Sequence, residues 1–206
     1  TLGCEGVLLA SCADIVKDGI MPVKVIDSQI IRYCPLGCSH CNLGQAVAQK
    51  LPELSLGDVK KILSQCGRLG VETINHRMGE SFLRDDFVEI LQATSNEYIN
   101  SLVISSGVGL NKKKIEAFYD LPGNNKLQFS LDGDTQEAND AIRFKGSFKN
   151  VLDSLEHLRA LRASGRESSL LIGISHALSD ENIHRIRNLF ELLRPYPVDF
   201  VGLASV

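Results

Sequence analysis

Residues 127–132 read Leu-Gln-Phe-Ser-Leu-Asp and alternate strictly between apolar and polar side chains. A period of two is the pattern of a β-strand whose two faces meet different surroundings. Residues 73–77 alternate in the same manner and place Thr73, Asn75 and Arg77 on one face. A closed eight-stranded barrel fills its interior with branched apolar side chains, whereas small polar residues suit a wider, incomplete barrel that holds a polar ligand. The two stretches therefore favour such an open barrel over a sheet with one solvated face.

The rest of the chain alternates strands with helices. Apolar, β-rich runs predict strands at residues 23–33, 71–77, 101–106, 127–132, 170–176 and 199–204. Four stripes of apolar residues between them keep helical spacing, the first after a capping Ser55: Val59, Ile62, Leu63 and Cys66; Phe87, Ile90 and Leu91; Phe148, Val151, Leu155 and Leu158; Ile183, Ile186 and Leu189. Such alternation predicts an α/β fold with parallel strands and right-handed crossovers, either a doubly wound sheet or a barrel.

Composition and charge exclude several classes of protein. With 44% hydrophobic and 23% charged residues, the 206-residue chain is globular rather than disordered or fibrous. The net charge is −3, and we interpret Lys112–Lys114 as a solvated helix face, so no nucleic-acid partner is expected. No apolar run has the length of a membrane span, and the stretch before Cys12 lacks the basic flank and long core of a signal peptide. We therefore expect a cytoplasmic protein without a membrane partner.

Three of the six cysteines, Cys34, Cys38 and Cys41, fall within eight residues directly after the first predicted strand. Soft thiolates select zinc, copper(I) or iron–sulfur clusters. Structural zinc and electron-transfer clusters take four protein ligands, and His40 is poorly placed as a fourth because it adjoins Cys41. Three thiolates without an obvious fourth ligand indicate an iron that is left open for another molecule. A disulfide framework is disfavoured, since it belongs to small secreted domains.

The other cysteines and histidines have simpler interpretations. Cys66 lies on an apolar helical stripe and is expected to be a buried core residue. Cys4 and Cys12 make no complete ligand set, so we interpret them as structural or incidental. Isolated histidines are more often structural or exposed than ligands, and this applies to His76, His157, His176 and His184.

The cysteine spacing at the end of a first strand resembles the radical S-adenosylmethionine (SAM) superfamily. The resemblance implies that Cys34, Cys38 and Cys41 carry a 4Fe–4S cluster and that His40 packs near the adenine of SAM. The family has two glycines and a glutamate after its second strand. This chain reads Met78-Gly79-Glu80 there, so Met78 replaces the first glycine of a motif that meets the SAM amino group largely through backbone oxygens.

The later strand ends carry the resemblance further, over residues 22–204. The run Ile104-Ser105-Ser106-Gly107 is similar to the family's hydroxyl-rich segment, which adds Ser106 to the implied SAM-binding residues. The segment after Phe129 is similar to the one in which a serine contacts the ribose and an arginine meets the SAM carboxylate. By that match the resemblance implies these roles for Ser130 and Arg143, and a planar guanidinium suits a carboxylate.

The resemblance implies both a fold and an activity. The fold is a partial (β/α)6 TIM-type barrel of parallel strands, with residues 1–21 as an N-terminal extension and residues 22–206 as the core domain. The activity is reductive cleavage of SAM at the 4Fe–4S cluster to a 5′-deoxyadenosyl radical, which abstracts hydrogen from the substrate. The cofactor supplies this reactivity, and the protein supplies orientation and exclusion of side reactions. A one-electron donor such as a flavodoxin or ferredoxin is also implied.

The segments around Ser130 and Arg143 look most like the branch whose members carry a cysteine-rich SPASM-type C-terminal extension. We accordingly expect the core domain to continue beyond Val206 and the substrate to be a peptide or protein residue. Two alternatives stay open: an enzyme that acts on a sugar, nucleoside or cofactor precursor, and a binding module whose iron–sulfur cluster is structural or transfers electrons.

Overall fold

Six parallel strands lie side by side in the order of the sequence in the computed structural model, which describes residues 23–41 and 52–205. They are β1 (Val25–Ser28), β2 (Thr73–His76), β3 (Asn100–Ser105), β4 (Lys126–Ser130), β5 (Leu171–Leu178) and β6 (Phe200–Ser205). The predicted α/β class and six-stranded partial barrel are confirmed. β1 is shorter than predicted, because the chain leaves the sheet after Ser28 on its way to the cysteine loop.

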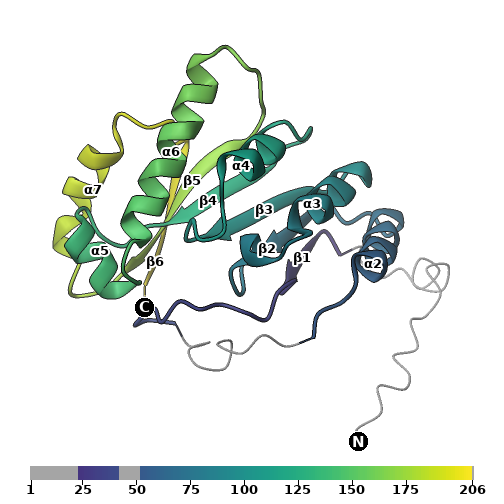
Figure 1. Ribbon diagram of the computed structural model, residues 1–206, viewed down its shortest axis with the longest axis horizontal. Coiled ribbons are helices and arrows are strands. Elements are labelled where there is room, and N and C mark those ends of the chain that lie inside the picture. Colours follow the sequence, from purple (N-terminus) through teal and green to yellow (C-terminus); the bar gives the residue numbers. More distant parts are fainter. Residues whose placement is uncertain (1–22, 42–51, 206) are drawn as a thin grey trace, which may run out of the picture.

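Helices fill the connections between successive strands (Figure 1). Because every crossover steps to the next strand with the same hand, the helices gather on one face of the sheet. They are α2 (Leu56–Arg68), α3 (Phe87–Asn96), α4 (Lys112–Tyr119), α5 (Gln136–Ile142), α6 (Ser147–Ala163) and α7 (Ile186–Leu193), with the short 3₁₀ turns η2 (Ser81–Leu83) and η3 (Ile183–Arg185). Within residues 23–41 and 52–205, none of these helices combines the length and apolarity of a membrane span.

Most residues of the predicted helix stripes are buried, Phe148 and Ile186 are half-buried, and two residues are exposed. Ser55 caps α2 as predicted, because its hydroxyl accepts a hydrogen bond from the Asp58 amide at 3.1 Å. Ile62 is 46% exposed, since the buried face of α2 runs through Val59, Leu63 and Cys66 and leaves Ile62 at its flank. Ile183 is 55% exposed because it belongs to η3 and precedes the first turn of α7.

The two faces of the sheet differ in the way that the alternation predicts. Side chains on the helix-covered face form the apolar core, and Val103, Phe129 and Ile174 have no exposed surface. The opposite face is the more polar one, because Asp27 pairs with Asn75 and Ser130 with Ser175, although β3 contributes Leu102 and Ile104 to it. The carboxyl ends of parallel strands meet at one edge of the sheet, so the functional residues that follow these strands are brought together.

His76 of β2 is a polar side chain that lies on the apolar face of the sheet. It is 1% exposed and packs edge-on against Phe87 of α3, with ring centroids 5.2 Å apart. Neither ring nitrogen has a hydrogen-bond partner among the residues that the structure describes. Burial lowers the pKa of His76 to about 4, so the ring is neutral at physiological pH. His76 therefore acts as a core residue, as expected for an isolated histidine.

Acid is expected to destabilise the protein through His76. The unfolded ring takes up a proton below about pH 6.5 whereas the folded ring does so only near pH 4, so protons favour the unfolded chain within this window. The resulting loss amounts to about 3 kcal/mol at 1.36 kcal/mol per pH unit. A His76→Phe variant should therefore lose less unfolding free energy between pH 7 and pH 4.5, as measured by chemical denaturation. His184→Gln, at an exposed histidine, should behave like the wild type, and parallel curves for His76→Phe and wild type would refute the assignment.

Candidate functional site

Nine of the ten predicted site residues line a single cavity of about 150 Å³ at the carboxyl ends of the strands. The exception is Met78, which is 37% exposed and does not contribute to the lining. Four further residues, which are not among the ten predicted site residues, also line the cavity: Leu36, Arg77, Ile104 and Ser105. The predicted residues in it are Cys34, Cys38, His40, Cys41, Gly79, Glu80, Ser106, Ser130 and Arg143. Segments more than one hundred positions apart thus converge on the three thiols.

Hydrogen bonds fasten the cysteine loop to the neighbouring strand ends. Within the loop, the Cys41 amide donates to the Cys38 carbonyl at 3.0 Å and closes a tight turn. The Ser39 amide donates to the carbonyl of Ile142, the last residue of α5, at 2.8 Å. Before the loop, the Tyr33 carbonyl accepts from the Glu80 amide at 3.3 Å. The thiols are therefore held between the end of β2 and the end of α5.

The three thiols suit an iron–sulfur cluster better than a single metal ion. Burial raises the pKa of Cys34 to about 11 and also raises the pKa of Cys38, against the opposing positive charge of Arg143. Both thiols therefore hold their protons at neutral pH until a metal displaces them. Among the described residues, no three Cys, His, Asp or Glu side chains converge closely enough to hold one ion. A 4Fe–4S cluster places each thiolate on its own iron, so thiols around a cavity fit it.

Gly79 is required by the geometry of the turn after β2. Its φ of +74° lies in the left-handed region that glycine adopts without strain. A Cβ atom at this position would lie 2.6 Å from the carbonyl oxygen of Ile31. The turn can therefore press against the chain that leads from β1 to the cysteine loop. The structure gives Gly79 a backbone role, in line with a motif that acts through backbone atoms.

The carboxylate of Glu80 forms hydrogen bonds with other residues of the protein. The side chain is buried, and its two oxygens accept hydrogen bonds from the Ser105 hydroxyl at 2.7 Å, the Ser106 amide at 2.8 Å and the Ser106 hydroxyl at 2.5 Å. Burial raises its pKa, and these hydrogen bonds act in the opposite direction. Glu80 thus ties the end of β2 to the end of β3 and fixes two serines in the cavity wall.

Asp132 was not among the ten predicted site residues, yet it is a buried charge at the site. Its carboxylate oxygen Oδ2 lies 2.6 Å from Nε of Arg143. A Cβ atom on Gly133 would lie 2.3 Å from the Asn139 amide nitrogen, so this turn packs directly against the backbone of α5. The period-two pattern contained a signal for Asp132, because it continues the polar face after Ser130.

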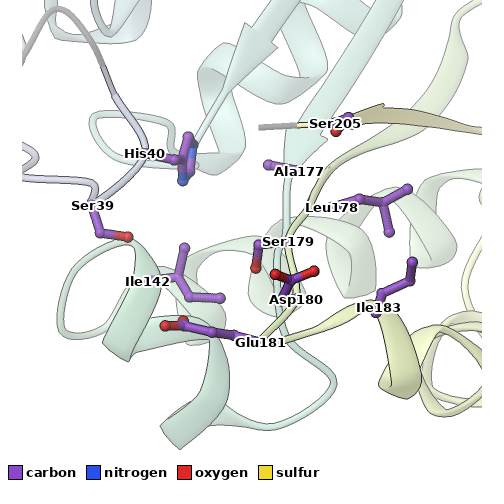
Figure 2. Close-up of a pocket in the computed structure, with 10 residues that line it drawn as sticks. All are labelled: Ser39, His40, Ile142, Ala177, Leu178, Ser179, Asp180, Glu181, Ile183 and Ser205. Carbon is purple, nitrogen blue, oxygen red and sulfur yellow. The ribbon is translucent and has the colours of Figure 1, made fainter.

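A second, larger cavity adjoins the first and has a volume of about 640 Å³. His40 lines both cavities, so the two share a wall. Figure 2 shows that the lining of the larger cavity comes from the cysteine loop, the end of α5, the end of β5 with the segment after it, and the end of β6. The lining residues are Ser39, His40, Ile142, Ala177, Leu178, Ser179, Asp180, Glu181, Ile183 and Ser205. The site therefore has room for a second molecule beside the thiol cavity.

Curated relatives resemble this chain over most of its length. One is "PqqA peptide cyclase" of Rhizobium meliloti (strain 1021), 27% identical over 174 residues, which are 84% of this chain and 44% of the relative. Another is "PqqA peptide cyclase" of Gluconobacter oxydans (strain 621H), 29% identical over 184 residues, which are 89% of this chain and 49% of the relative. The chain spans less than half the length of these two relatives.

Solved structures share the fold at low sequence identity. Streptococcus suis SuiB bound to S-adenosylmethionine superposes with a TM-score of 0.79 at 16% identity, over 94% of this chain and 43% of SuiB. Native anSMEcpe with bound AdoMet gives a TM-score of 0.70 at 12% identity, over 89% of this chain and 51% of anSMEcpe. The strands and helices of the present chain are thus those of known SAM-binding proteins.

A family model matches the part of the sequence that forms most of the sheet, helices α2 to α7 and the thiol cavity. The model of the radical SAM superfamily matches residues 28–193, which include all ten predicted site residues. Proteins of this superfamily use a 4Fe–4S cluster and SAM. The match covers well over half of the chain and confirms the resemblance that the cysteine spacing indicated. The chain belongs to the radical SAM superfamily.

Proposed function

We propose that this protein uses a three-thiolate 4Fe–4S cluster and SAM to modify a residue of a peptide or protein substrate. The convergence of nine predicted residues on one cavity carries the proposal. When bound, the cluster and SAM supply one-electron cleavage of the sulfur–C5′ bond, which provides a radical able to take hydrogen from an unactivated carbon. The protein's own residues bind, orient and shield the reactants.

The walls of the thiol cavity match the functional groups of SAM. In the proposal, Cys34, Cys38 and Cys41 hold the cluster, and the Arg143 guanidinium binds the SAM carboxylate. The hydroxyl of Ser130, at the end of β4, contacts the ribose. His40, Ser106 and the backbone of residues 78–80 complete the cofactor site, in which the carboxylate of Glu80 has the structural task of holding Ser105 and Ser106.

In the proposal, the larger cavity of about 640 Å³ takes the part of SAM that the thiol cavity of about 150 Å³ has no room for, and also the substrate. It shares His40 with the thiol cavity, so a molecule held there lies next to the bound cofactor. A peptide substrate is favoured by the relatives, which are PqqA peptide cyclases by name, and by a structural neighbour, SuiB bound to precursor peptide SuiA. Binding of substrate in this cavity would also keep solvent from the reacting atoms. A flavodoxin or ferredoxin remains the predicted electron donor.

Anaerobic reconstitution tests the proposal. The protein is loaded with iron and sulfide, and SAM and dithionite are added. We expect about four irons per chain in the cluster bound at the three thiols, and release of 5′-deoxyadenosine and methionine in equal amounts. With a candidate peptide deuterated at the reacting carbon, deuterium should appear in the 5′-deoxyadenosine. An intact cluster that yields no 5′-deoxyadenosine would refute the enzymatic function and leave a structural or electron-transfer role for the cluster.

A further inference from the structure

Asp132 is a carboxylate with no exposed surface at the point where β4 leads into α5. Its Oδ1 accepts a hydrogen bond from the Ala177 amide at 2.7 Å, and its Oδ2 lies 2.6 Å from Nε of Arg143. Burial of an unpaired carboxylate is strongly unfavourable, whereas burial with a cation and a hydrogen-bond donor is tolerated. The charge of Asp132 is therefore matched by Arg143.

The position of the Asp132 carboxylate is fixed by its own backbone. The Asp132 amide donates to Oδ1 of Asn139 at 2.9 Å, and its carbonyl accepts from Nδ2 of Asn182 at 3.2 Å. These partners belong to α5 and to the segment after β5, so the residue is held from two sides. Asp132 is thus held in one position, and the longer side chain of Arg143 takes its orientation from the Asp132 carboxylate.

Arg143 reaches Asp132 from the end of α5. The chain beyond it is held by Asp140, whose carboxylate accepts from the Gly146 amide at 2.7 Å and the Phe148 amide at 3.0 Å. The Arg143 side chain is 9% exposed and lines the thiol cavity. Guanidinium has five N–H donors, and Nε provides only one of them. With Nε beside Asp132, the two terminal nitrogens can bind a second anion.

The cysteine loop meets the same pair. Nδ1 of His40 lies 3.9 Å from Oδ2 of Asp132, and His40 stands between Cys38 and Cys41 in the sequence. The loop also docks on the carbonyl of Ile142, the residue before Arg143. One buried carboxylate therefore lies between the thiol-bearing loop and the arginine of the cavity.

We propose that Asp132 is a positioning residue that orients the Arg143 guanidinium toward the carboxylate of SAM. This inference rests on the proposed function, in which Arg143 binds that carboxylate. A guanidinium held in place before binding loses less freedom when the anion arrives, which strengthens binding. The charges alone predict the opposite, namely that Asp132 weakens SAM binding, because its negative charge repels the carboxylate of SAM. The sign of the effect of an Asp132→Asn substitution therefore separates the two ideas.

The experiment measures equilibrium binding of SAM to the full chain with its reconstituted cluster. Asp132→Asn keeps an acceptor for the Ala177 amide but removes the charge beside Arg143, and we expect SAM binding to weaken about tenfold. The iron content and the spectrum of the cluster without SAM should stay at wild-type values. The change that SAM causes in the electron paramagnetic resonance spectrum of the reduced cluster should become smaller. Arg143→Met should weaken binding at least as much, and adding Asp132→Asn to it should have no further effect.

Control variants test whether the effect on SAM binding is specific to Asp132 and depends on Arg143. Asp134 pairs with Arg185 at 2.5 Å and contributes to neither cavity, so Asp134→Asn should leave SAM binding unchanged. Asp132→Asn that binds SAM as tightly as the wild type, or more tightly, would overturn the inference. An equal loss in the Arg143→Met background would overturn it too, because the effect would then not pass through Arg143.

A further variant covers the case in which Asp132→Asn fails to load the cluster. Lysine has one charged nitrogen and lacks the rigid planar fork with which guanidinium holds two anions on different nitrogens. Arg143→Lys should then weaken SAM binding about as much as Arg143→Met, and binding near the wild-type level would overturn the inference. If the wild-type protein with its cluster does not bind SAM, the proposed function itself fails. If the wild type and Asp132→Asn bind SAM equally well, only the inference about Asp132 fails.

Discussion

Replacing Cys38 with alanine is expected to abolish the formation of 5′-deoxyadenosine from SAM and dithionite. Cys38 lines the thiol cavity with Cys34 and Cys41, and no other thiol of residues 23–41 and 52–205 contributes to its wall. Even residues that only support metal ligands are worth 10–100-fold in metal affinity or activity, so loss of a direct ligand should exceed about 100-fold. The measurement is the amount of product per chain after anaerobic reconstitution, together with the iron content.

Cys66→Ala is the matched control for this substitution. Cys66 is a buried free cysteine on α2 and contributes to neither cavity. Its replacement removes one sulfur from the protein and costs about 1 kcal/mol of packing, but it should leave iron content and product at wild-type levels. If Cys38→Ala retained its iron and made product, the cluster would not be bound as proposed. If both variants lost activity alike, the thiol cavity would have no special role.

The arrangement of strands could be predicted because each strand carries its own local signal. Residues 127–132 alternate between apolar and polar side chains, because successive side chains of the strand point in turn to the helix-covered face and to the opposite face of the sheet. Parallel strands then bring their carboxyl ends together without further information, so residues as distant as Cys34 and Arg143 could be assigned to one site from the sequence. Periodicity and topology together were sufficient for this part of the structure.

Features that depend on long-range contacts could not be predicted in this way. α5 has a single buried residue, Asn139, and therefore lacks the apolar stripe from which α2, α3, α6 and α7 were predicted. The part played by Asp132 depends on its contacts with Ala177 and Arg143, whereas the local sequence indicates only that it continues the polar face of β4. Lys114 was interpreted as part of a solvated face, yet its ammonium group donates to the carbonyls of Phe82 at 2.7 Å and Gly109 at 3.0 Å. Each of these features arises only once distant segments are packed.

Replacing Glu80 with alanine is expected to lower the unfolding free energy by about 3 kcal/mol or more. The substitution leaves three buried donors, the hydroxyls of Ser105 and Ser106 and the amide of Ser106, without their acceptor. Each unsatisfied buried donor costs about 1–3 kcal/mol. Chemical denaturation at neutral pH measures the loss. A destabilisation below about 1 kcal/mol would show that the ends of β2 and β3 are not held together by this carboxylate.

Glu80→Gln separates this structural role from direct contact with SAM. Glutamine keeps one oxygen that can accept from Ser106, and its amide can donate to the hydroxyl of Ser105. We therefore expect Glu80→Gln to retain most of the stability and to bind SAM within about threefold of the wild type, which corresponds to less than 1 kcal/mol. If the carboxylate instead met the positively charged amino group of SAM, its neutralisation should weaken binding tenfold or more while leaving stability largely intact. A large loss of affinity in a stable Glu80→Gln protein would thus place the charge of Glu80, and not only its hydrogen bonds to β3, in the cofactor site.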